Sequence, residues 1–180
     1  MDDVALCIRQ ARAEDAADLA RIYIDSWHDT YPGILGHRLL GAMSLKGHTA
    51  RFRAAAKGPG MLLLAEQAGH GPVGLAGLGA ARDKALGFDG EIYTLYVDPA
   101  FLGQGVGRAL MAGAFQCLTH RRMQSCLVWA HAKNPACFFY EAMGGRRVAA
   151  RTTHLLGEAT PEIGFGWKGL AALRQNRPVL

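Results

Sequence analysis

Three glycines at alternate positions, Gly103, Gly105 and Gly107, mark the segment of the sequence best suited to bind an anion. They follow a β-branched and aromatic segment and precede an amphipathic one, so they should join a strand to a helix. Glycine lets backbone N–H groups approach a ligand closely, and the first N–H groups of a helix have no partner within it. The turn therefore predicts a site for a phosphate or pyrophosphate group at a helix N-terminus.

Two well-known phosphate-binding motifs do not fit this turn. The dinucleotide fingerprint needs a third glycine three residues after the second, and that position is Arg108 when counted from Gly103 or Leu110 when counted from Gly105. The phosphate loop of nucleoside triphosphatases needs Gly-Lys followed by Ser or Thr, which the sequence lacks. Hydride transfer and ATP hydrolysis therefore lose their main support.

Strand and helix patterns alternate along the rest of the sequence. Apolar segments bounded by Gly, Pro or turn residues predict strands at 4–10, 61–67, 72–81, 91–98, 125–132, 148–156 and 162–167. Spacings of three and four predict helices at 16–28 and 105–120, a less regular helical stretch over 35–57, and a helix from Asn134-Pro135 to Gly144-Gly145. Because the strand, turn, helix and strand between 91 and 132 form a parallel crossover unit, this order predicts a mixed sheet with helices packed on it.

The composition is that of one folded domain. With 180 residues, half of them hydrophobic (50%), the chain can bury a core, which excludes global disorder. No apolar run reaches the roughly 18 residues that span a bilayer, and the N-terminal Met-Asp-Asp is acidic where a signal peptide is basic. The four cysteines include no Cys-x-x-Cys pair, which is typical of reduced thiols. We therefore expect a cytoplasmic protein that does not bind a membrane.

Basic residues are concentrated in the second half of the sequence. The formal net charge is +5, and residues 100–151 contain one acidic residue, Glu141, against seven basic ones: Arg108, Arg121, Arg122, Lys133, Arg146, Arg147 and Arg151. This region is suited to an anionic ligand. No helix-turn-helix, zinc or RNP-type motif accompanies the charge, so nucleic acid is not the expected partner. No His, Cys or Asp spacing indicates a metal site.

Two motifs together make the sequence resemble the GCN5-related N-acetyltransferase (GNAT) superfamily, over about residues 4–168. The family signature Arg/Gln-x-x-Gly-x-Gly/Ala falls on residues 102–107, where the glycines match and Leu102 replaces Arg or Gln. The second motif, Asn before a helix that carries Phe-Tyr-Glu and ends in Gly, matches Asn134 and Tyr140. These two residues are six apart, where many members have seven.

The resemblance implies a fold and an activity. The fold is an α/β (α+β) domain with a single mixed, mostly antiparallel sheet of about seven strands, helices on both faces, and a splay between the fourth and fifth strands. It would occupy residues 1–168, followed by a C-terminal tail at 169–180. The activity is transfer of an acetyl group from acetyl-CoA directly to a primary amine, with no acyl-enzyme and no metal.

Two side chains would move protons in this reaction. In the family, the tyrosine that matches Tyr140 has its hydroxyl near the sulfur of coenzyme A and can protonate the departing thiolate, although its aromatic neighbours alone are more typical of core packing. An amine attacks a thioester only in its neutral form, so a base is needed. Glu91 stands where an acid often accepts this proton, directly or through water. Asp98 and a water chain are the alternatives.

The resemblance also implies which residues bind the two substrates. In the family, the backbone of the fourth strand pairs with the pantetheine arm and the glycine turn binds the pyrophosphate; the corresponding residues are Leu95, Tyr96, Val97, Gly103, Gln104, Gly105, Val106, Gly107, Arg108 and Asn134. The end of the first helix, with Trp27 and Tyr31, would form one wall of the acceptor pocket. From the residues alone, Asn134 is also a helix N-cap and Trp27 a core residue.

Other functions remain open. A non-catalytic acetyl-CoA-binding regulatory domain would share the glycine turn but would not need Tyr140 or a base. A protein N-terminal or lysine acetyltransferase would share the whole mechanism, because the glycine turn does not distinguish between acceptors. We favour a small-molecule amine, since the chain is compact and has no added domain. Homodimers are frequent in the family, so a homodimer is also expected.

Overall fold

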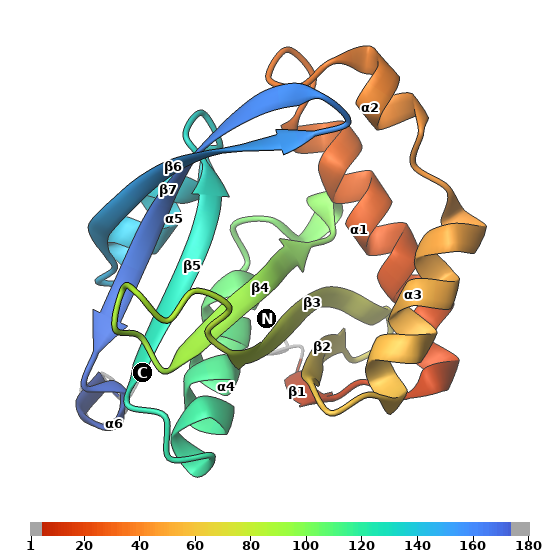
Figure 1. Ribbon diagram of the computed structural model, residues 1–180. Coiled ribbons are helices and arrows are strands. Elements are labelled where there is room, and N and C mark those ends of the chain that lie inside the picture. Colours follow the sequence, from red (N-terminus) through yellow and green to blue (C-terminus); the bar gives the residue numbers. More distant parts are fainter. Residues whose placement is uncertain (1–4, 174–180) are drawn as a thin grey trace. The chain divides into compact units, whose positions relative to one another are not determined.

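The computed structural model describes residues 5–173 and contains a seven-stranded sheet with the strand order β1-β2-β3-β4-β5-β7-β6 (Figure 1). β4 (Gly90–Val97) pairs in parallel with β5 (Ser125–His131), whereas β1 with β2, β2 with β3, and β7 with both β5 and β6 pair antiparallel. The parallel ladder joins Gly90–Ile92 to Cys126–Val128 and is short, as expected for strands that splay. The expected mixed, mostly antiparallel sheet is confirmed.

The described residues group into two compact units. The first contains residues 5–78 and 94–113, and the second contains residues 79–93 and 114–173. β3 (Gly71–Ala80), β4 and helix α4 (Val106–His120) each contribute residues to both units.

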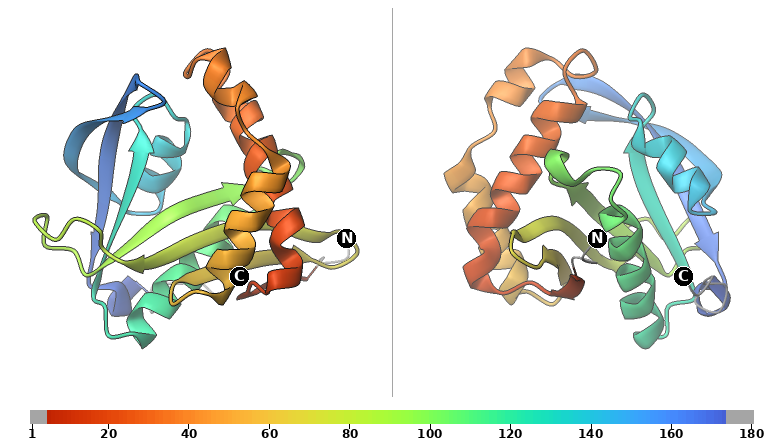
Figure 2. Two further views of the ribbon diagram at one scale, coloured as in Figure 1. Left: turned by 45° about the vertical axis from the view of Figure 1, so that its right-hand side comes forward. Right: turned by 180° about the vertical axis from the view of Figure 1, so that it is seen from behind.

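In the first unit, helices cover both faces of the strands (Figure 2). The elements that belong wholly to this unit are β1 (Leu6–Gln10), η1 (Ala13–Asp15), α1 (Ala16–Thr30), α2 (His37–Gly41), α3 (Leu45–Lys57), β2 (Met61–Gln67) and η2 (Pro99–Phe101). Leu62, Leu64 and Leu75 pack with residues of α1 and α3 in one core cluster. On the other face, a Cβ atom at Gly113 of α4 would lie 2.9 Å from Ile8, so α4 approaches β1 closely.

The second unit is built on β5, α5 (Ala136–Ala142), β6 (Arg146–Leu155) and β7 (Glu158–Lys168), and it ends in α6 (Leu170–Leu173). The rings of Tyr140, Phe115 and Phe165 lie within 6.2 Å of one another or of Trp167, and the Trp167 indole donates to the Met143 carbonyl at 2.9 Å. A smaller cluster contains Ala81, Phe88 and Leu127.

The strands near the C-terminus differ most from the sequence prediction. β6 begins at Arg146 and β7 runs from Glu158, so together they form a longer hairpin than the expected strands at 148–156 and 162–167. Part of the expected tail at 169–180 is helical, because α6 occupies Leu170–Leu173 and Leu170 is buried. Residues 174–180 lie outside the described part of the chain.

Candidate active site

The glycine turn connects β4 to α4 and lies within the first unit. Gly103 and Gly105 have φ values of +75° and +84°, which glycine adopts without the steric cost of a side chain. A Cβ atom at either position would meet no atom within 4 Å, so both glycines border open space. The first hydrogen bond at the start of α4 runs from the Ala109 N–H to the Gly105 carbonyl (3.0 Å). The N–H groups of residues 106–108 precede it and have no acceptor within the helix. This cradle fits a diphosphate.

The side chains of the turn contribute less than its backbone. Leu102 is exposed and apolar, so it brings no hydrogen-bonding group. The Gln104 side chain folds back and donates to the Ala100 carbonyl (3.1 Å), which braces the turn. Arg108 is exposed in the first turn of α4, where its positive charge is available to an anion.

Asp98 fixes the start of the turn. One carboxylate oxygen accepts the N–H of Ala100 (3.0 Å) and the other accepts the Arg21 guanidinium (2.8 Å). This hydrogen bond raises the pKa of Arg21. Asp98 therefore holds η2 against α1, a role that sequence reasoning missed because Arg21 lies far away in the sequence.

The residues at the end of β4 are half-buried, and some of the backbone groups there already have hydrogen-bond partners. Leu95, Tyr96 and Val97 were expected to offer backbone groups to the pantetheine arm. The Val97 carbonyl accepts the Ser26 hydroxyl (2.9 Å), and the Asp98 N–H donates to the Val73 carbonyl (2.9 Å). The strand end is thus held between α1 and β3, in a fixed position beside the turn.

Trp27 and Tyr31 lie together at the end of α1. Their ring centroids are 4.7 Å apart, and Tyr31 is buried. Trp27 packs against two core clusters, as a core residue would. Its indole N–H, however, is the single buried side-chain polar atom with no hydrogen-bond partner among residues 5–173. A buried donor without a partner costs free energy that a ligand oxygen could recover.

Tyr140 lies on α5 and Asn134 lies just before this helix, both in the second unit. The Asn134 side-chain oxygen accepts the N–H of Ala136 (2.8 Å), the first residue of α5, whereas the N-cap position itself is occupied by Pro135. Asn134 therefore lies one residue before the N-cap that its residue type predicts. Tyr140 is 5% exposed, and its ring packs against Phe165 with a centroid distance of 5.5 Å. Packing and a catalytic role are compatible, because only the hydroxyl group is needed for proton transfer.

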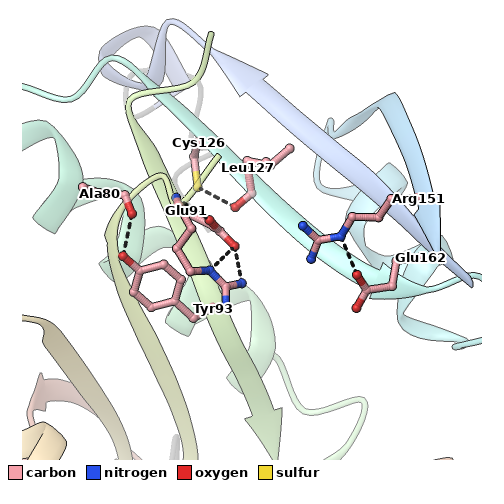
Figure 3. A network of polar contacts seen from close by, with 8 residues as sticks. Ala80, Glu91, Tyr93, Cys126, Leu127, Arg151 and Glu162 are labelled. Atoms are coloured by element: carbon pink, nitrogen blue, oxygen red, sulfur yellow. Dashed lines mark hydrogen bonds and ion pairs between the residues drawn. The ribbon is translucent and has the colours of Figure 1, made fainter. Parts of the chain in front are cut away.

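Glu91 is buried in the second unit, with 1% of its surface exposed. Its carboxylate accepts the backbone N–H of Arg82 (2.9 Å) and two donors of the Arg82 guanidinium, one of them Nε at 3.0 Å (Figure 3). These hydrogen bonds raise the pKa of Arg82. The Arg82 side chain itself is 62% exposed, so the buried acid is covered by a cation that borders solvent.

Sequence reasoning missed this ion pair. The signal was present in the two opposite charges that flank the connection between β3 and β4, where the Ala81 N–H also donates to the Asp89 carbonyl (2.9 Å). No group of three or more His, Cys, Asp or Glu residues between 5 and 173 is placed to hold a metal ion. Within the same range, no helix has the length and apolar character needed to cross a membrane.

Comparisons with known proteins identify the family of the chain. The model of the acetyltransferase (GNAT) family matches residues 16–145. The uncharacterized N-acetyltransferase YuaI of Bacillus subtilis is 32% identical over 167 residues, which cover 93% of this chain and 95% of that protein.

Solved structures share the fold. A GCN5-related N-acetyltransferase from Rhodopseudomonas palustris superposes with a TM-score of 0.74 at 25% identity and covers 93% of this chain and 97% of that one. The PaiA N-acetyltransferase from Thermoplasma acidophilum, solved in complex with coenzyme A, gives a TM-score of 0.68 at 18% identity, with 91% and 99% of the two chains covered.

Proposed function

The chain belongs to the acetyltransferase (GNAT) family and is an N-acetyltransferase, and we propose that it transfers the acetyl group of acetyl-CoA directly to the primary amine of a small molecule. The observation that carries the proposal is the turn at Gly103 and Gly105, which presents the first N–H groups of α4 to open space. A diphosphate is the part of acetyl-CoA that such a cradle binds. The coenzyme A complex of the PaiA protein supports the same ligand.

We assign the binding of acetyl-CoA to backbone groups first. The N–H groups of residues 103–108 would hold the diphosphate, with Arg108 adding a positive charge. The backbone of Leu95–Val97 would hold the pantetheine arm, and one N–H of this strand would polarise the acetyl carbonyl. Asn134 would contribute from the start of α5. When bound, acetyl-CoA supplies the thioester carbonyl that the amine attacks.

We assign proton transfer to Tyr140 and Glu91. The amine nitrogen forms a bond to the acetyl carbon as the carbon–sulfur bond breaks, and the proton lost by the amine passes to Glu91. The Tyr140 hydroxyl donates its proton to the coenzyme A thiolate. Arg82 must leave Glu91 for this to happen, and its side chain is 62% exposed, so it can move into solvent.

The roles of the two acids can be separated by mutation. Glu91→Gln is expected to lower kcat by about 100-fold or more, because the base is removed. Asp98→Asn is expected to keep turnover close to wild type and to cost at most about 1 kcal/mol of stability, since Asp98 serves the Arg21 pair and the η2 cap. Initial rates with saturating substrates measure both effects.

Arg82→Gln is the control for the Glu91 variant. A base at position 91 remains active without Arg82, whereas a purely structural ion pair fails equally when either partner is lost. Comparable loss of kcat in Glu91→Gln and Arg82→Gln would therefore remove Glu91 from the base role.

Trp27 and Tyr31 are assigned to the acceptor, and the unpartnered Trp27 indole N–H supports this role. The alternative function is a regulatory domain that binds acetyl-CoA without using it. Mass detection of products from acetyl-CoA and a panel of small primary amines separates the two. We expect one amine to gain an acetyl group in step with the release of free thiol. Binding of acetyl-CoA without any acetylated amine would favour the regulatory domain.

A further inference from the structure

Two arginines of the second unit are held in the same way. Arg82 donates to Glu91, and its guanidinium carbon lies 4.9 Å from the Tyr93 ring centroid. Arg151 donates through Nε to Glu162 (2.7 Å), and its guanidinium carbon lies 3.9 Å from the Trp129 ring centroid. A carboxylate at Nε and an aromatic face beneath the plane leave a guanidinium little freedom to rotate.

A glycine makes room for the aromatic ring on which Arg151 stacks. Trp129 on β5 lies opposite Gly164 on β7, and a Cβ atom at Gly164 would approach the Trp129 ring to 3.2 Å. The absence of a side chain there lets the indole lie against β7, and Arg151 from β6 covers it. β6 also places Arg151 opposite Glu162 in the ladder, so the ion pair and the stacking are set by strand register.

The outer edge of Arg151 is available to a ligand. Within residues 5–173, its only hydrogen bond uses Nε, so both terminal amino groups lack a protein partner. Figure 3 shows this end of the guanidinium pointing toward the side where Glu91 lies. Two parallel N–H donors on a fixed plane match the two oxygens of a carboxylate.

The charges near Arg151 alternate in sign. Glu91 bonds Arg82, the charge of Glu162 contributes to the raised pKa of Arg82, and Glu162 bonds Arg151. If an ammonium group replaces the exposed Arg82 on Glu91, the next charge in this row is the carboxylate of Glu162, and the next cation is Arg151. Arg151 is therefore the cation that a second charged group of the acceptor would meet. A second cation there would be repelled, and a neutral group would leave the Arg151 donors unused. An anionic group would be bound.

Resting on the proposed function, in which Glu91 receives the amine proton, we propose that the acceptor is a small amine that also carries a carboxylate, and that Arg151 stacked on Trp129 binds this carboxylate. The acceptor ammonium exchanges with Arg82 on Glu91, and the carboxylate pairs with the terminal amino groups of Arg151. Arg151 is thus a specificity-determining residue and takes no part in proton transfer.

The test compares L-amino acids with their primary amides, which keep the α-amine and carry a neutral group in place of the carboxylate. Wild type is expected to prefer the acid, and Arg151→Gln is expected to lower kcat/KM for the acid by about 10- to 100-fold through KM, because charge-assisted hydrogen bonds are lost. The value for the amide should stay unchanged. Arg151→Lys should recover part of the loss, since it keeps the charge without the planar pair of donors.

Arg147→Gln is the matched control. Arg147 also donates through Nε to a carboxylate, that of Glu141 (2.7 Å), and lies over an aromatic ring, that of Phe165, but on a different part of the unit. Its loss should leave the preference for the acid intact. Equal rates with acids and amides, or equal effects of Arg151→Gln on both, would overturn the inference while leaving the proposed function in place. A failure of the proposed function is distinct, because then no amine of any charge would be acetylated.

Discussion

Gly105→Glu is expected to weaken acetyl-CoA binding by at least about 100-fold, because three effects act together. A non-glycine residue at φ +84° is strained, which costs on the order of 1–3 kcal/mol. The new side chain fills space that is open in wild type. Its carboxylate also places a negative charge where the diphosphate is expected. Titration calorimetry with acetyl-CoA measures the change in affinity.

Gly157→Glu is the matched control for this variant. Gly157 has φ +86°, also borders open space, and lies in the turn between β6 and β7. The substitution brings the same strain and the same charge to a position outside the glycine turn. We expect a comparable loss of thermal stability in both variants and a loss of acetyl-CoA affinity in Gly105→Glu alone. Unchanged acetyl-CoA affinity in Gly105→Glu would show that the diphosphate does not bind at this turn.

Tyr140→Phe is expected to lower kcat by about 100- to 1,000-fold while acetyl-CoA affinity stays within a few-fold of wild type. The phenylalanine ring keeps the packing against Phe165 and Trp167, so the variant loses the hydroxyl without a cavity. Its cost in stability should be no more than about 1 kcal/mol, which is typical of one lost hydrogen bond. Steady-state rates and calorimetry on the same preparation separate the two effects.

The leaving thiol offers a check on the role of Tyr140. An acetyl thioester of a more acidic thiol needs less protonation as it departs, so the penalty of Tyr140→Phe should shrink with such a donor. A penalty that is the same for all thioesters would assign Tyr140 to packing or binding. If Tyr140→Phe were as active as wild type, a group other than Tyr140 would protonate the departing thiolate.

Much of the fold could be predicted from sequence because local patterns were strong. β2 occupies Met61–Gln67, the range expected, since an uninterrupted apolar run ends at a glycine turn. α4 covers Val106–His120, close to the expected 105–120. The parallel crossover between β4 and β5 follows from the strand, turn, helix and strand order between them.

The longer hairpin of β6 and β7 could not be predicted in the same way. Thr160 and Pro161 interrupt the apolar alternation of β7, yet both residues pair with β6, opposite Thr153 and Thr152. Pairing across the hairpin therefore decides these strand bounds, and a single-segment pattern does not contain it. α6, at Leu170–Leu173, is too short for helical periodicity to show.

In the candidate site, too, local features could be predicted from sequence and contacts between distant residues could not. The glycine turn is local in sequence, and its conformation matches the expectation from residue type. The partners of the acidic residues are distant in sequence or lie across a strand connection, as Arg21 is from Asp98 and Arg82 is from Glu91. The stacking of Arg151 on Trp129 depends on the register of three strands, which no spacing rule gives.

The most direct test of the central claim is thermal unfolding of the wild-type chain with and without acetyl-CoA. At about 100 times its Kd, a ligand that binds only the folded state stabilises the fold by about 2.7 kcal/mol, which is a readily measured upward shift of Tm. We predict this shift with acetyl-CoA. An unchanged Tm at saturating acetyl-CoA would contradict the account, because the glycine turn at Gly103 and Gly105 would then serve a different anion.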